Sequence, residues 1–165
     1  MRAAWLIGWA TLRRKRVSLA AFAGAAGFFH WLVAVSFPAI GGLETVNSVV
    51  TTFPDGLRQL LKLAPNLQAG FGILDYLAFS WFHPVFLGLG AAFVVSRATD
   101  ALAKGVETGA VYLVLSRPVA RWSFVAGKAG ELIVGAGVIS LAAWLGMVLG
   151  ATMALDAVLP LGRYL

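Results

Sequence analysis

The sequence predicts an all-α, polytopic integral membrane protein with three transmembrane helices. Of 165 residues, 60% are hydrophobic and only 12% are charged, whereas soluble domains carry about 25% charged residues. The mean hydropathy is +0.86. Three long apolar runs account for this value, and each has the roughly 20 residues that a helix needs to cross a hydrocarbon core. A single aqueous core cannot bury so much apolar surface in a chain of this size, so membrane lipids must cover much of it.

The distribution of charge excludes several classes of function. The formal net charge is +6, but the cations gather at the ends of the apolar runs, as topology signals do, and we expect no nucleic acid partner. The absence of cysteine excludes a disulfide framework, a thiolate metal site and a cysteine nucleophile. A membrane-embedded enzyme is the least favoured class, because no span holds a nucleophile with its base or a pair of carboxylates.

Residues 1–16 are predicted to form an interfacial helix. Trp5 and Trp9 stand four residues apart and share a helical face, and indole rings favour the headgroup layer. The basic residues 13–16 follow the first short apolar piece instead of preceding it, which is unlike a signal peptide. The alternative is a frayed cytoplasmic tail.

The three spans are predicted over residues 17–40, 74–96 and 132–155. Pro84 removes a backbone donor and therefore predicts a kink in the second span. In the third span, Gly146 and Gly150 are four residues apart, which predicts a face of close helix packing.

Residues 41–73 form the loop between the first two spans. Leu57, Leu60 and Leu61 fall at helical spacing, and Pro65 ends the run, so we expect a short amphipathic helix on the outer surface. Amphipathic stripes usually pack, so packing over the bundle is favoured over a role in substrate binding.

The orientation follows from the positive-inside rule. The loop 41–73 has few cations, and nearby acids offset them. The segment 97–131 adds five cations: Arg97, Lys104, Arg117, Arg121 and Lys128. We therefore expect a multi-pass protein of the plasma (cell inner) membrane, with the N-terminus and the segment 97–131 in the cytoplasm. Residues 156–165, after which the chain stops, are expected at the extracytoplasmic end, and the sequence is interpreted as truncated there.

The segment 97–131 carries an ordered set of motifs. They are Glu107-x-Gly109, an apolar stretch at 111–115, Ser116-Arg117-Pro118-Val119-Ala120-Arg121, and Gly127-Lys128. This order resembles the permease subunits of type-two ABC transporters, in which Glu-x-Gly-Thr, Leu-Leu-Ser-x-Pro-Val-Ser-Arg and Gly-Lys join the second and third membrane helices. The chain departs from that pattern at Val106, Ala110 and Ala120. The resemblance covers the N-terminal three-helix half of such a permease.

The resemblance implies a permease component of an exporter, driven by ATP that a separate cytoplasmic ATPase subunit hydrolyses. A coupling helix is expected from about Lys104 to Ser116, followed by a corner at Pro118 and a re-entry helix. The residues expected to couple to the ATPase are Lys104, Glu107, Gly109, Ser116, Arg117, Pro118 and Arg121. Such permeases have six spans, so we also expect a second permease chain or a missing C-terminal half, in a homo- or hetero-oligomer.

The chain itself is not expected to be an enzyme. Gly127-Lys128 lacks the earlier glycine of a phosphate loop, and Ala129 follows it instead of serine or threonine. ATP would be bound by the partner subunit, and no cofactor is expected in this chain. A different class of function remains open, namely a small membrane scaffold or accessory protein whose cytoplasmic loop binds a partner without transport.

Single residues of the segment have simpler interpretations. The alternative for Arg117, Arg121 and Lys128 is a role as topology determinants and headgroup anchors. Glu107 either contacts a partner or pairs with Lys104 or Arg121. Four residues are predicted as interfacial anchors: Trp5, Trp9, Trp122 and Lys128.

Two histidines, His30 and His83, lie inside predicted spans, where polar groups usually face the bundle or a cavity. His83 either donates to a carbonyl freed by the kink at Pro84 or lines a substrate pathway, and His30 is equally open between packing and pathway. No carboxylate stands at metal-ligand spacing from either, so no metal site is expected. Asp75 is explained by solvation at the interface.

Overall fold

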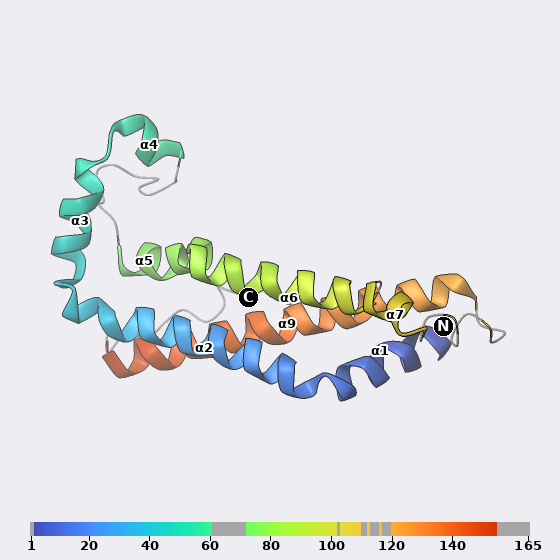
Figure 1. The fold of residues 1–165 in the computed structure, drawn as a ribbon. Coiled ribbons are helices and arrows are strands. Elements are labelled where there is room, and N and C mark those ends of the chain that lie inside the picture. Colours follow the sequence, from blue (N-terminus) through green and yellow to red (C-terminus); the bar gives the residue numbers. More distant parts are fainter. Residues whose placement is uncertain are drawn as a thin grey trace. The chain divides into compact units, whose positions relative to one another are not determined.

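The computed structural model describes residues 2–60, 72–101, 103–109, 112, 116 and 120–154, with the side chains of all of these except 2, 58–60 and 104. In this part of the chain every regular element is a helix (Figure 1), which confirms the predicted fold class. Three stretches are long and apolar enough to cross a membrane: Arg16–Ala39, Ile73–Glu107 and Arg121–Ala154. Three candidate transmembrane helices indicate a multi-pass membrane protein.

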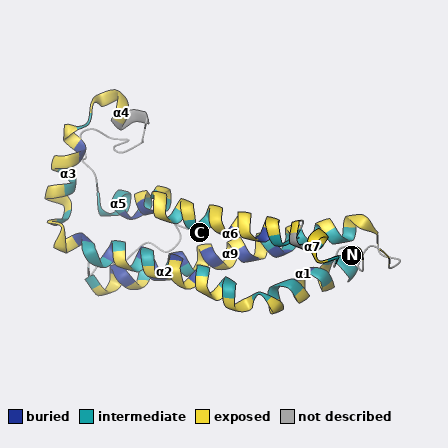
Figure 2. Cartoon of the chain, viewed as in Figure 1, coloured by how far each residue is buried: buried dark blue, intermediate teal, exposed yellow. Residues whose placement is uncertain are grey.

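The chain divides into two compact units. Unit 1 comprises Met1–Ala26 and Leu87–Ala142, and unit 2 comprises Gly27–Phe86 and Ala143–Leu165. Three helices contribute residues to both units: α2 (Arg16–Ala39), α6 (Pro84–Ala101) and α9 (Arg121–Ala154). Less than a third of the most apolar window of each candidate span is buried, and Figure 2 shows exposed residues along all three helices. This apolar surface requires lipid or another protein to cover it.

Unit 1 begins with α1 (Arg2–Arg14), which packs closely on α9. A Cβ on Gly8 would lie 2.9 Å from the carbonyl oxygen of Gly127, and a Cβ on Gly127 would lie 2.7 Å from that of Ala4. Such separations exclude any side chain, so glycine at both positions lets the two backbones meet. In α6 the buried Phe93 packs edge-to-face on Phe22, with ring centroids 5.6 Å apart.

The predicted coupling helix from Lys104 to Ser116 is not continuous. Helix α7 covers Ala103–Glu107 and ends at a turn in which Gly109 adopts φ +70°. The N–H of Gly109 donates to the carbonyl of Val106 at 3.1 Å, as it does where a left-handed glycine terminates a helix. Tyr112 is helical again, while residues 110–111 and 113–115 lie outside the described part.

The predicted re-entry helix and third span are one helix. Helix α9 runs without a break from Arg121 to Ala154, so the boundary expected at residue 132 does not exist. The apolar spacing of residues 121–131 continues into the span, and nothing there interrupts the backbone. Pro118, where the corner was predicted, lies outside the described residues.

Unit 2 is built on the second part of α2, the end of α9 and α5 (Ile73–Phe79). Its core is small and apolar, and consists of Ala34, Leu77, Met147 and Ala151 with Leu74, Tyr76, Trp144 and Val148 packed around them. A Cβ on Gly146 would collide with the carbonyl oxygen of Gly27, and one on Gly150 would lie 2.7 Å from that of Trp31. The predicted packing face of Gly146 and Gly150 is therefore confirmed.

The second span is broken, not kinked. After α5 come the short 3-10 helix η1 (Ser80–Phe82) and an extended residue, His83, with φ −65° and ψ 135°. Pro84 is then the first residue of α6. At that position its missing N–H leaves no helical carbonyl unsatisfied, so the prediction of one kinked helix over 74–96 is wrong.

The loop 41–73 contains two helices within its described residues, α3 (Gly42–Thr52) and α4 (Asp55–Leu60). Helix α4 is the beginning of the predicted amphipathic helix, and its expected continuation to Pro65 lies outside the described part. Helix α3 was not predicted, because its β-branched and small polar residues have modest helix propensity. Four of them donate to carbonyls three or four residues earlier: Asn47, Ser48, Thr51 and Thr52.

Candidate functional site

The centre of the candidate site is an ion pair between α6 and α9 in unit 1. Arg97 and Glu131 are only 4% and 3% exposed, and Arg97 Nε lies 3.4 Å from Glu131 Oε1. These two atoms have no hydrogen-bond partner in the described structure, so the contact is an ion pair without hydrogen-bond geometry. Arg97 also donates through Nη2 to the carbonyl oxygen of Lys15 at 3.5 Å and lies over the ring of Phe93. One guanidinium thus connects α6, α9 and the junction between α1 and α2.

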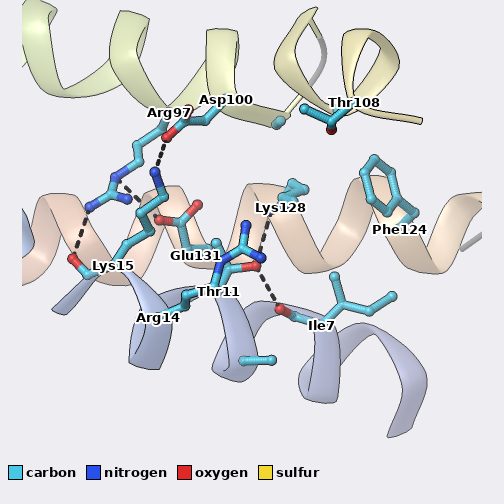
Figure 3. Close-up of a pocket in the computed structure, with 13 residues that line it drawn as sticks. Ile7, Thr11, Arg14, Lys15, Arg97, Asp100, Thr108, Phe124, Lys128 and Glu131 are labelled. Carbon is cyan, nitrogen blue, oxygen red and sulfur yellow. Dashed lines mark hydrogen bonds and ion pairs between the residues drawn. The ribbon is translucent and has the colours of Figure 1, made fainter. Parts of the chain in front are cut away.

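Three further contacts extend this arrangement (Figure 3). Lys15 forms an ion pair with Asp100, which joins the α1–α2 junction to the end of α6. Lys128 donates to the hydroxyl of Thr11 at 3.0 Å, and that hydroxyl donates to the carbonyl of Ile7 at 2.9 Å. We call this set the charged cluster; its members are Thr11, Lys15, Arg97, Asp100, Lys128 and Glu131.

The charged cluster lines a cavity of about 520 Å³ within unit 1. This volume lies in the range of roughly 300–1,000 Å³ that is usual for small-molecule sites. The other lining residues come from α1, α6, α7, the turn after α7 and α9, and are Ile7, Ala10, Arg14, Ala101, Gly105, Thr108 and Phe124. Four lining residues are cations and two are carboxylates, which leaves a net charge of +2.

Three of the residues predicted to couple to an ATPase are exposed, and Gly109 is partly buried. Glu107 is the last residue of α7, Ser116 lies in a turn, and Arg121 begins α9, all with exposed side chains. Arg117, Pro118 and the side chain of Lys104 lie outside the described part. Among the described side chains no ion pair joins Glu107 to Arg121, so the pairing with Arg121 is wrong, while the pairing with Lys104, whose side chain lies outside the described part, stays a prediction.

Four predicted interfacial anchors differ in their surroundings. Trp5 and Trp9 stack with ring centroids 6.0 Å apart, and both are exposed on α1. Trp122 is also exposed. Lys128 instead points to Thr11 and belongs to the charged cluster. A frayed N-terminal tail is excluded for residues 2–14, which are helical.

The two histidines pack within unit 2. His30 is fully buried among the rings of Phe29, Trp81 and Phe86, whose centroids lie 4.7–5.2 Å away. His83 Nδ1 accepts the N–H of Val85 at 3.3 Å. The predicted donation by His83 to a freed carbonyl is wrong, because the helix break removes the kink that would free one.

Two more observations concern acidic groups. Asp75 accepts the N–H of Gly72 at 2.8 Å and so caps α5, a role that the expected solvation did not include. In the described part of the chain, no three His, Asp or Glu residues lie close enough together to hold a metal ion.

Sequence reasoning missed the charged cluster. It treated Lys15 and Arg97 as topology signals and gave Asp100 and Glu131 no role. The available signal was that Arg97 and Glu131 stand at the two ends of the polar segment, 97–131, in a chain with only seven acidic residues. Spacing alone does not show which of several cations a carboxylate meets.

Comparison with protein-family models, with curated proteins and with solved structures finds no match for this chain. The motif order and the geometry of the charged cluster are therefore the evidence about function.

Proposed function

We propose that the chain is a transmembrane permease component of an ABC exporter, in which the segment 97–131 receives motion from a separate cytoplasmic ATPase. The motif order from Glu107 to Lys128 supports this proposal, together with the three candidate spans. The chain would work with a second permease chain or a further half that supplies the remaining helices. On this proposal the segment and the N-terminus face the cytoplasm, as the distribution of cations favours.

The observation that carries the proposal is the Arg97–Glu131 ion pair. It joins the two ends of the segment, because Arg97 lies near the end of α6 and Glu131 lies ten residues into α9. A load on the exposed residues between them would reach both helices together. Removing one partner would leave the other charge buried and isolated, at a cost of about 3–5 kcal/mol, so each side chain requires the other.

The turn after α7 supports the same role. Glu107 is exposed at the end of α7, and the left-handed Gly109 follows at a sharp change in chain direction. Arg121 and Trp122 are exposed at the start of α9. These groups offer charge and apolar contact to a water-soluble partner, and the adjacent helices connect them to the membrane domain.

Co-purification with an ATPase tests the proposal. Tagged chain would be extracted from the membranes of its host in mild detergent, and vanadate-sensitive ATP hydrolysis would be measured in the eluate. Mass spectrometry should identify a co-eluting protein that contains a phosphate loop of the form Gly-x-x-x-x-Gly-Lys-Ser/Thr. We expect the double variant Glu107→Ala, Arg121→Ala to lose this activity.

The matched control is Arg13→Ala with Glu44→Ala, which removes the same charges from exposed positions outside the segment. It should retain the ATPase. If the wild-type chain retains no protein with a phosphate loop, the coupling proposal fails and a membrane scaffold without transport becomes the better interpretation.

A further inference from the structure

We propose that the cavity of unit 1 binds the phosphate group of an anionic phospholipid from the adjacent leaflet. This goes beyond the proposed function, because it requires no ATPase and concerns lipid as a ligand instead of as a solvent. Three features of the cavity support this proposal: its charge, its hydrogen-bond donors and its position beside an interfacial helix.

The lining of the cavity carries a net positive charge. Among the lining residues, Lys15 is paired with Asp100 and Arg97 is paired with Glu131. Arg14 and Lys128 have no carboxylate within ion-pair distance among the described side chains. The contact of Lys128 with the hydroxyl of Thr11 adds no negative charge to the cavity. The cavity therefore attracts a ligand with a net negative charge.

Hydrogen-bond donors also line the cavity. Arg97 Nε is buried 3.4 Å from Glu131 Oε1, so that atom already faces a carboxylate. The ion pair holds the guanidinium of Arg97 in the cavity wall, beside the side chains of Arg14 and Lys128. Guanidinium and ammonium groups together are the usual partners of phosphate oxygens, and Arg14, Arg97 and Lys128 supply both kinds.

Part of the cavity wall is apolar. Ile7, Ala10 and Phe124 share the lining with the cations, so the cavity has both an apolar wall and a charged region. Helix α1 also carries the exposed, stacked rings of Trp5 and Trp9, which favour the headgroup layer. A cavity beside such a helix meets lipid headgroups at high local concentration, so a phospholipid is favoured over free phosphate as the source of the anion.

The experiment measures lipid retention by the purified, full-length chain. Native mass spectrometry would record the fraction of protein bound to phosphatidylglycerol or to phosphatidylcholine, each supplied in the same detergent at physiological ionic strength. We expect phosphatidylglycerol to be retained preferentially. The double variant Arg14→Gln, Lys128→Gln should lower its retention about 25-fold, since each basic residue near an anionic headgroup contributes a factor of about five.

The control is Arg13→Gln with Arg16→Gln, which removes the same charge from exposed positions outside the cavity. It should keep most of the retention, because neither residue lines the cavity. The single variant Arg14→Gln alters only an exposed side chain and guards against misfolding of the double variant. Gel filtration and tryptophan fluorescence should match the wild type.

Three results would overturn the inference. Equal losses in the cavity variant and in the control would show that lipid is held by surface charge alone. Retention of both lipids to the same extent would show that the cavity does not select an anion. A third result, displacement of phosphatidylglycerol by millimolar inorganic phosphate, would assign the cavity to the free anion and overturn the lipid source. The outcome does not depend on the ATPase experiment, because no ATPase is present.

Discussion

The two units of this chain differ in the contacts that join the helices within each of them. Unit 1 joins its helices through buried and half-buried charges, with Arg97 and Glu131 at the centre. Unit 2 joins its helices through glycines that let backbones touch, as Gly8 and Gly127 also do in unit 1, and through aromatic rings around His30. The same three long helices contribute to both units, so the difference lies in which residues face their neighbours. Salt screens contacts between exposed charges, whereas it does not screen close apolar packing.

The largest effect is expected from the ion pair of unit 1. Arg97→Leu leaves Glu131 buried without its cation and should lower the free energy of unfolding by about 3–5 kcal/mol. The double variant Arg97→Leu, Glu131→Leu should be close to the wild type, since it leaves no isolated charge. Unfolding by denaturing detergent, followed by tryptophan fluorescence, measures both. Equal destabilisation of the single and double variants would mean that the loss does not come from leaving Glu131 without its cation.

A smaller effect is expected from the closest approach in unit 2. Gly146→Ala places a methyl group against the carbonyl of Gly27 and should cost about 1–3 kcal/mol, because the helices must move apart. The control is Gly137→Ala on the same helix, where the new methyl meets nothing within 4 Å. It should be neutral or stabilise by up to about 1 kcal/mol. The same unfolding assay applies, and a Gly146→Ala variant as stable as the control would contradict the packing of unit 2.

A local effect is expected at the turn after α7. An added methyl at Gly109 meets nothing within 4 Å, but the residue has φ +70°, and alanine there costs about 1–2 kcal/mol. Gly109→Ala should therefore speed amide hydrogen exchange in residues 103–109. Gly130→Ala, within α9 and also without close contacts, should leave that exchange unchanged. Unaltered exchange in the first variant would show that the turn does not depend on the left-handed conformation.

The smallest effect is expected from the half-exposed ion pair of unit 1. Lys15 and Asp100 are each 28% exposed, so Lys15→Met should cost no more than about 1 kcal/mol. The cost should vanish at about 1 M salt, where the screening length is near 3 Å. Arg13→Met, an exposed neighbour, serves as the control in the same unfolding assay. A loss that persists in high salt would place Lys15 with the buried pair instead of with the surface charges.

The fold was largely predictable, and the candidate site only in part. The apolar runs and the interfacial helix depend on composition and short-range spacing, which the sequence displays directly. The break at His83 could not be separated from a kink, because proline is compatible with both a bent helix and the first turn of a new one. Helix α3 was missed because its helix propensity is modest and the packing of its buried Val50 against Tyr76 is a long-range contact that the sequence does not display.

The sequence by itself determined an all-α chain with three apolar stretches long enough to cross a membrane, since length and hydropathy are local properties. It also placed exposed charge around Glu107 and Arg121. Only the tertiary structure decided that Arg97 meets Glu131, that Lys128 turns toward Thr11, and that these groups enclose a cavity. The reason is physical: partners 34 and 117 positions apart are chosen by how the helices pack, and many cations in this sequence would satisfy the same pattern.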